Sequence, residues 1–116
     1  MSDAPNIVNL TPHAINIVDE KTKAVIRTFP PGGPPARCQE LRSPAEDLDG
    51  VPFTVVSYGE VFDLPPQDLK TRYIVSMLVA QTLGELREDL CFVGPLVRDD
   101  AGVIIGATGL ARFDYF

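Results

Sequence analysis

The chain has 116 residues, of which 45% are hydrophobic, and a formal net charge of −6 at pH 7. This length and composition predict a single globular domain over residues 6–116, preceded by a frayed N-terminus over residues 1–5. The negative charge argues against non-specific binding to nucleic acid and against docking on anionic lipid, because both need a basic surface.

Cysteine content and hydropathy indicate the compartment. Two cysteines are too few for a disulfide framework, and free thiols are typical of a reducing cytosol. No apolar run approaches the ~20 residues of a membrane span, and the first residues lack the basic and apolar segments of a signal peptide. We therefore expect a cytoplasmic protein that does not bind membranes.

The N-terminal half of the chain predicts short strands joined by turns. Residues 14–18 and 24–29 form an expected hairpin, because a polar run separates two β-prone segments. Residues 29–35 form an expected loop, since proline cannot donate to a strand ladder and Gly-Gly accepts positive φ. A second loop, over 43–50, ends in an Asp-Gly turn signal. Further strands are expected at 7–10, 36–41 and 51–58.

The C-terminal half predicts the single helix, over residues 77–86, with Ser76 as its N-cap. A strand over 72–75 leads into it, 96–98 and 103–106 form a second hairpin, and 110–116 form an edge strand. The sum is about seven short strands and one helix. We expect an α+β fold built on a mostly antiparallel curved sheet or partial barrel. The apolar face of the helix comprises Leu78, Val79, Thr82, Leu83 and Leu86.

The single histidine lies in a polar interruption between two apolar strands, Asn9-Leu10-Thr11-Pro12-His13. One interpretation is a binding rim that presents Asn9, Thr11 and His13 to a ligand. The other is a structural turn, in which Asn9 and Thr11 bond to nearby backbone and Pro12 fixes φ. A lone histidine cannot build a histidine metal site, and catalysis would need a partner supplied by the fold.

Other positions suit an anionic ligand. Arg37 follows a Pro/Gly loop through which backbone could approach an anion, and a guanidinium binds phosphate in bidentate fashion. Ser76 opens a helix whose first N–H groups are free donors, and Tyr73 offers a ring for stacking. A stiff loop and a capped structural helix are the plainer alternatives. The predicted ligand-binding set is Asn9, Thr11, His13, Arg37, Tyr73, Ser76 and Arg98, with no cofactor, metal or catalytic residue assigned.

Motifs spread over nearly the whole chain carry a resemblance. They include Asn9-Leu10-Thr11-Pro12-His13, Tyr73-Ile74-Val75-Ser76 and Val97-Arg98-Asp99 followed by Gly102. On these motifs the chain resembles a group of small proteins found in phages, prophages and bacterial genomes. The resemblance implies an accessory protein in the host cytoplasm and no particular reaction. Phage accessory proteins of this size often inhibit host defence, and some act as sponges for nucleotide signals.

Three functions follow as hypotheses. The first is a non-enzymatic module that sequesters a small anionic, nucleotide-like ligand. The second is an acidic protein-binding or virion-associated module, for which the aromatic C-terminal tail over 113–116 supplies a contact edge; self-association is also open. The third is a nucleotide hydrolase or lyase with His13 and Glu60 as acid and base. Convergence of the arginines favours the first hypothesis, and scatter of the arginines favours the second.

Overall fold

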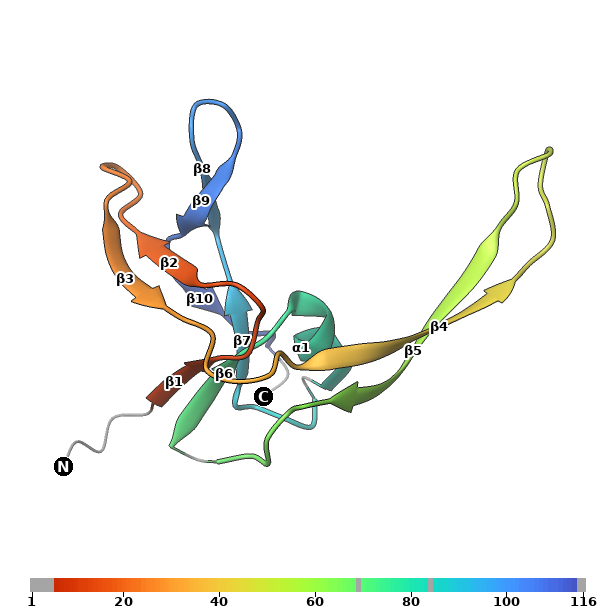
Figure 1. Ribbon diagram of the computed structural model, residues 1–116, viewed down its shortest axis with the longest axis horizontal. Helices are drawn as coiled ribbons and strands as arrows, with labels where there is room; N and C mark the ends of the chain where they lie inside the picture. Colours follow the sequence, from red (N-terminus) through yellow and green to blue (C-terminus); the bar gives the residue numbers. More distant parts are fainter. Residues whose placement is uncertain (1–5, 69, 84, 115–116) are drawn as a thin grey trace.

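The computed structural model describes residues 6–68, 70–83 and 85–114, which form an elongated α+β molecule (Figure 1). The radius of gyration is 17.2 Å and the principal extents are 58 × 40 × 27 Å. A compact domain of this length has a radius of gyration of about 13 Å. The difference arises because two limbs extend from a central sheet, one of them a long two-stranded arm.

The central sheet contains four strands in the order β1 (Asn6–Asn9), β6 (Thr71–Ile74), β7 (Leu90–Val93) and β10 (Leu110–Ala111). The first three strands are parallel, and β10 joins the edge antiparallel to β7. Both faces of this sheet are covered, and side chains therefore alternate between two apolar clusters. On β6, Tyr73 belongs to the cluster on the helix side, whereas Ile74 belongs to the other.

The short helix α1 (Met77–Leu83) covers one face of the central sheet. Ser76 caps it, with its hydroxyl 3.2 Å from the Val79 N–H, as the sequence predicts. Val79 and Ala80 face the core beside Phe92 of β7. The phenyl ring of Phe92 also lies 4.8 Å from that of Phe113, so the described part of the C-terminal tail packs on the body.

The second sheet, which we call the lobe, has the order β3 (Val25–Phe29), β2 (Ile15–Val18), β9 (Ile104–Ala107) and β8 (Leu96–Arg98). Two antiparallel hairpins meet along β2 and β9, which are parallel and pair at Ile17 and Ala107. Gly106 permits this approach, because a Cβ there would lie 2.6 Å from the Asn16 carbonyl oxygen. Phe29 and Ile15 of the lobe pack against the second face of the central sheet.

The third sheet is a two-stranded hairpin, β4 (Arg37–Pro44) and β5 (Thr54–Phe62), which we call the arm (Figure 1). Its root is anchored because Cys38 and Val61 pack against the helix-side cluster. Its tip is a tight turn in which Asp49 and Gly50 both have positive φ, at 53° and 77°. This is the backbone that an Asp-Gly pair favours, and Leu48 and Val51 exchange two hydrogen bonds across it.

A buried ion pair fixes the chain where it returns from the arm to the central sheet. The Arg87 guanidinium donates two hydrogen bonds to the Asp89 carboxylate, at 2.9 and 2.8 Å, and a third to the Pro65 carbonyl. The hydrogen bonds with Asp89 raise the pKa of Arg87 above its ordinary value. Asp89 is 1% exposed, and the Arg87 guanidinium is the cationic partner of its carboxylate.

The α+β class with one helix in the described residues is confirmed, but several details of the sequence prediction are wrong. The described strands number ten, in three sheets, and they form no closed barrel. The expected antiparallel sheet is interrupted by the parallel pairings of β1, β6 and β7 and by that of β2 with β9. Residues 43–44 extend β4 instead of opening a loop. Residues 1–5 and 115–116 lie outside the described part.

Two further corrections concern elements of the C-terminal half. Strand β7 was not predicted, because both of its faces are buried and its sequence therefore lacks alternation. The helix ends at Leu83 rather than Leu86, and the Leu86 and Arg87 N–H groups both donate to the Leu83 carbonyl. Leu86 is consequently 76% exposed. No helix in the described ranges is long and apolar enough to cross a membrane.

We predict that Asp89→Ala lowers the free energy of unfolding by about 3 kcal/mol, because it leaves the Arg87 guanidinium without its buried partner. Urea denaturation of the purified protein measures this change. Glu40→Ala is the matched control, since it breaks the exposed Glu40–Arg42 pair and costs at most about 1 kcal/mol. Equal losses in the two variants would contradict the structural role of Asp89.

Candidate functional site

The Asn9 carboxamide is the centre of the polar turn between β1 and β2. Its nitrogen donates to the carbonyls of His13 and Phe29, at 2.8 and 2.9 Å. Its oxygen accepts hydrogen bonds from the Thr11 N–H and hydroxyl, at 2.8 and 2.7 Å. Asn9 is 1% exposed, and these four bonds use the hydrogen-bonding capacity of its amide. Asn9 therefore ties the turn to the end of β3 and faces no solvent.

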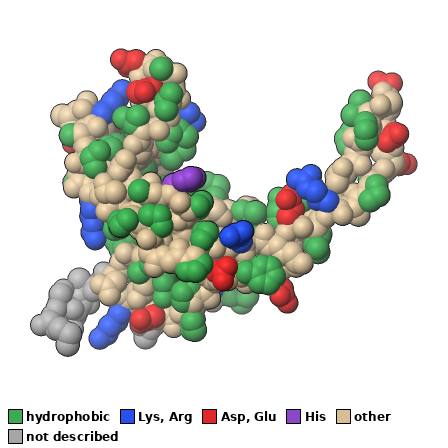
Figure 2. Space-filling model, viewed as in Figure 1, with side chains coloured by type: hydrophobic (Ala, Val, Ile, Leu, Met, Phe, Trp, Pro, Cys, Tyr) green, Lys and Arg blue, Asp and Glu red, His purple; other side chains and the backbone are tan. Residues whose placement is uncertain are grey.

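His13 and Arg37 flank this turn at the surface. The Ala36 N–H donates to the Leu10 carbonyl at 3.0 Å, so the root of the arm begins beside the turn. Figure 2 shows the single histidine of the chain in the hollow between the lobe and the arm. Among the described residues, Arg37 has neither an ion pair nor a hydrogen bond from its guanidinium. The structure thus brings Asn9, Thr11, His13 and Arg37 into one region.

The other three predicted ligand residues do not join that region as free groups. Tyr73 is buried in the helix-side cluster, where its ring has no face open to a stacking ligand. The Ser76 hydroxyl accepts the Val79 N–H as a helix cap. Arg98 lies on β8 in the lobe, and its guanidinium donates to the Gly102 carbonyl of its own hairpin. These placements show local structural roles for Tyr73, Ser76 and Arg98.

The described arginines are distributed over the molecule rather than gathered in one pocket. Arg27 lies over the Phe29 ring, 4.4 Å from its centroid. Arg42 pairs with Glu40 on the arm, Arg87 pairs with Asp89 in the core, and Arg98 bonds within its turn. Three of these four groups therefore already have a polar partner. These four guanidinium groups do not converge on one pocket.

The two cysteines lie in different environments. Cys38 packs at the arm root near Thr82, whereas Cys91 belongs to the apolar cluster on the other face of the central sheet. Burial raises the pKa of the Cys91 thiol to about 11, which leaves it protonated and unreactive at neutral pH. Within the described ranges, no group of three or more histidine, cysteine or acidic side chains is arranged to hold a metal ion.

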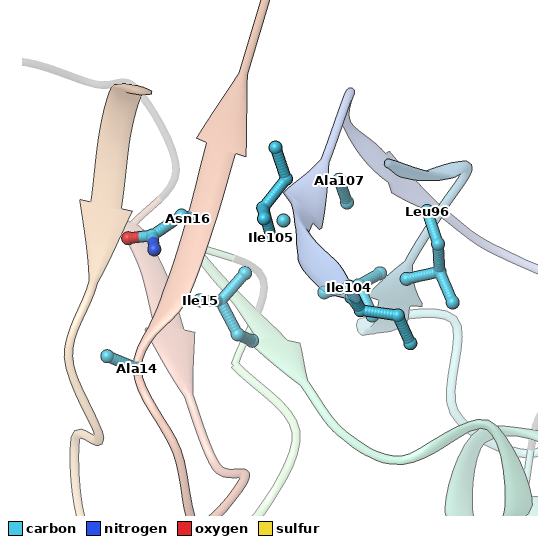
Figure 3. Close-up of a pocket in the computed structure, with 9 residues that line it drawn as sticks. Ala14, Ile15, Asn16, Leu96, Ile104, Ile105 and Ala107 are labelled. Atoms are coloured by element: carbon cyan, nitrogen blue, oxygen red, sulfur yellow. The ribbon is translucent and has the colours of Figure 1, made fainter. Parts of the chain in front are cut away.

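The lobe contains an open apolar pocket of about 250 Å³. Figure 3 shows Ile15 of β2 on one side of it and Ile104 and Ile105 of β9 on the other, with Leu96 of β8 beyond them. No charged residue lines it, and its one polar side chain, Asn16, accepts a hydrogen bond from Thr28. The pocket therefore offers an anion no cationic partner. The remaining lining residues are Ala14, Val93, Gly106 and Ala107.

The arm exposes an unusual amount of apolar surface. Cross-strand partners share a face, so Leu41, Ser43, Val55 and Ser57 lie together on one side of the hairpin. Leu41 and Val55 are 48% and 55% exposed. The pairing continues beyond the strands, because Ala45 donates to the Phe53 carbonyl, and Phe53 extends the same face. We call these five residues the apolar arm face; it contains no charged side chain.

The opposite face of the arm is partly charged. It carries Glu40 and Arg42, joined by a 2.7 Å ion pair, beside Val56 and Tyr58. Sequence reasoning missed the arm as a functional surface because 43–50 was assigned to a loop. A strand was expected over 51–58, but a β-prone sequence alone does not show whether the body covers one of its faces.

In comparisons with known proteins, no family model, no curated protein and no solved structure matches this chain.

We predict that Asn9→Ala lowers the free energy of unfolding by about 2–4 kcal/mol, because the carbonyls of His13 and Phe29 lose their shared donor inside the protein. His13→Ala is the control on the same turn. It removes an exposed ring and changes stability by no more than about 0.5 kcal/mol. Thermal and urea unfolding measure the loss in free energy of unfolding in both variants. Similar losses in the two variants would contradict the structural role of Asn9.

Proposed function

We propose that the chain is a non-enzymatic protein-binding module whose docking element is the β4–β5 arm. The observation that carries this proposal is the exposure of Leu41, Phe53 and Val55 on one uncharged face of a ribbon that projects from the body. An isolated two-stranded hairpin is at best marginally stable in water. An arm of this length with one apolar face is therefore suited to packing against a further surface.

Charge supports the same function. The tip of the arm carries Glu46, Asp47 and Asp49, and Figure 2 shows acidic side chains gathered there. With a net charge of −6, the molecule repels nucleic acid and disfavours non-specific association with other acidic proteins. Specific contact through the uncharged arm face avoids this repulsion and requires no charge to be buried. In the setting implied by the sequence resemblance, such a module is a phage accessory or virion-associated protein.

Affinity purification with matched variants tests this function. We expect Leu41→Ser combined with Val55→Thr to lower the recovery of bound proteins at least tenfold, because two central apolar contacts are lost. Glu40→Gln combined with Arg42→Gln alters only the opposite face and is the control. Recovery of the same proteins in the same amounts on all three baits would overturn the proposal.

A second candidate is sequestration of a small anionic ligand, such as a cyclic dinucleotide or an ADP-ribose derivative, in the hollow beside Thr11, His13 and Arg37. The observation in its favour is that the Arg37 guanidinium has no intramolecular partner among the described residues. Arg98, Tyr73 and Ser76 take no part in this narrower site.

Turnover that is lost in His13→Ala would instead support a nucleotide hydrolase or lyase that also uses Glu60.

Thermal denaturation tests the ligand candidate. A ligand held by Arg37 should raise Tm by about 10 °C at a hundredfold excess over its Kd, and Arg37→Gln should abolish the shift. Arg42→Gln, a change further along the arm at the exposed pair with Glu40, should leave it intact. If no cyclic dinucleotide or ADP-ribose derivative changes Tm, this candidate fails.

A further inference from the structure

We propose that the arm binds an extended segment of another protein, which adds as a third strand beside β5 and carries lysine or arginine on either side of an uncharged centre. This inference rests on the proposed docking role of the arm and names the kind of partner. A two-stranded ribbon has open edges as well as open faces, and the unpaired backbone groups along an edge determine what can bind there.

The outer edge of β5 has no neighbouring strand among the described residues, because β5 pairs with β4 alone. In an antiparallel pair, residues that bond across the ladder alternate with residues whose backbone groups point outward. Ala45 donates to the Phe53 carbonyl, so Val55 and Ser57 bond across the ladder as well. The outward-pointing N–H and carbonyl groups belong to the residues between them, Thr54, Val56 and Tyr58.

The two edges of the ribbon differ in their protection against pairing. Proline and charged side chains are the common protection of an edge strand. On β4, Pro44 has no N–H, and Glu40 and Arg42 carry charges where the N–H groups point outward. On β5, residues 54–58 contain neither proline nor a charged side chain, and all five are exposed. The unprotected edge is therefore that of β5, and an extended backbone is the ligand that matches it.

The side chains beside this edge define the centre of the added strand. Successive side chains of a strand point to opposite faces. One set on the added strand would therefore continue the apolar arm face beside Val55, and the other set would lie beside Val56 and Tyr58. These three side chains are 55%, 37% and 49% exposed, so apolar surface is open on both faces. Uncharged, β-branched residues fit such a position on both sides of the strand.

The arm also contains most of the net charge of the chain. Residues 38–63 include six acidic side chains and one arginine, so they account for −5 of the net charge of −6. Glu46, Asp47 and Asp49 lie towards the tip, beyond one end of the uncharged stretch. Glu60 and Asp63 lie beyond its other end. All five are exposed, and among the described residues none forms an ion pair. A strand beside β5 therefore meets carboxylates at both ends, where lysine or arginine is complementary.

A second copy of this chain is a poor occupant of the same edge. Two β5 strands paired with each other would bring the acidic ends of both arms together, and like charges opposite one another destabilise a sheet. The net charge of −6 adds a general repulsion between copies. A basic segment of another protein gains ion pairs where a second copy meets repulsion.

A synthetic peptide of nine residues tests the pairing with the purified full chain. In this peptide threonine and valine alternate between two terminal lysines, and fluorescence anisotropy of a labelled form measures Kd. We expect saturable binding to the wild type. Glutamate in place of both lysines should weaken binding at least tenfold. N-methylation of the seven central amides keeps the side chains and charges but removes the donors, and it should also weaken binding at least tenfold.

Matched variants of the protein test the charge at the edge. Glu60→Gln combined with Asp63→Asn should weaken binding of the lysine peptide at least threefold, because one end of the strand loses its carboxylates. Glu85→Gln combined with Glu88→Gln removes the same charge from exposed positions on the body and should leave Kd unchanged. Equal effects of the two pairs would show that only net charge matters and would overturn the proposed register of charges.

Amide hydrogen exchange measured by NMR distinguishes strand pairing from any other contact. In the free protein, the N–H groups of Val55 and Ser57 bond to β4 and should exchange more slowly than those of Val56 and Tyr58. Saturation with the lysine peptide should slow the exchange of Val56 and Tyr58 at least tenfold.

Three results would overturn the proposal. They are a peptide that does not bind, one that binds equally well after N-methylation, and one that leaves the exchange of Val56 and Tyr58 unchanged. A dimer of the purified chain in which these two amides are already protected would also overturn it, because a second copy would then occupy the edge.

The outcomes separate this inference from the proposed function. If the peptide does not bind while the Leu41→Ser, Val55→Thr bait still loses other proteins, the strand pairing is wrong and the docking role of the arm stands. If the bait loses nothing and the peptide does not bind, both are wrong.

Discussion

A two-stranded ribbon buries too little apolar surface to be stable alone, and the β4–β5 arm is such a ribbon. Most of this molecule can be understood as a support that holds the arm away from the body. The root is fixed by Cys38 and Val61 against the helix-side cluster, and the tip is closed by the Asp49–Gly50 turn. Between root and tip, the interactions seen among the described residues are the hairpin's own backbone hydrogen bonds and one exposed ion pair. What stabilises that section is the main physical question that this fold raises.

Paired polar groups hold together the body that supports the arm. The Asn9 carboxamide joins the first turn to the end of β3. Arg87, paired with Asp89 just before β7, also donates to the Pro65 carbonyl in the segment that follows the arm. The part of the chain that the structure describes contains no buried side-chain polar atom without a partner. Asn9 and Tyr73, which the sequence predicted as ligand contacts, hold the body together through hydrogen bonds and packing. That leaves the uncovered apolar surfaces as the features without a structural explanation.

Local signals in the sequence were sufficient for much of this fold. The Ser76 cap, the Asp-Gly turn and both lobe hairpins depend on neighbouring residues, and the structure confirms them. Strand β7 and the parallel pairing of β1 with β6 depend on contacts between distant segments, which a single sequence does not reveal. The candidate site shows the same difference between what neighbouring residues determine and what contacts between distant segments determine. The composition of the polar turn suggested both a ligand rim and a structural turn, and only the four bonds of Asn9 show that its amide holds the turn. The arm face was missed because exposure is a property of the folded molecule.

Hydrogen exchange along the arm tests the central claim most directly, since it reports whether the ribbon is covered. In the purified chain, the amides of β4 and β5 between Leu41 and Val55 should exchange faster than those of β6 and β7, because no described part of the chain covers the arm. Their exchange should slow when a protein recovered on the wild-type bait is added, while the amides of β6 and β7 stay as protected as before. Arm amides that the added protein leaves unchanged would contradict the account.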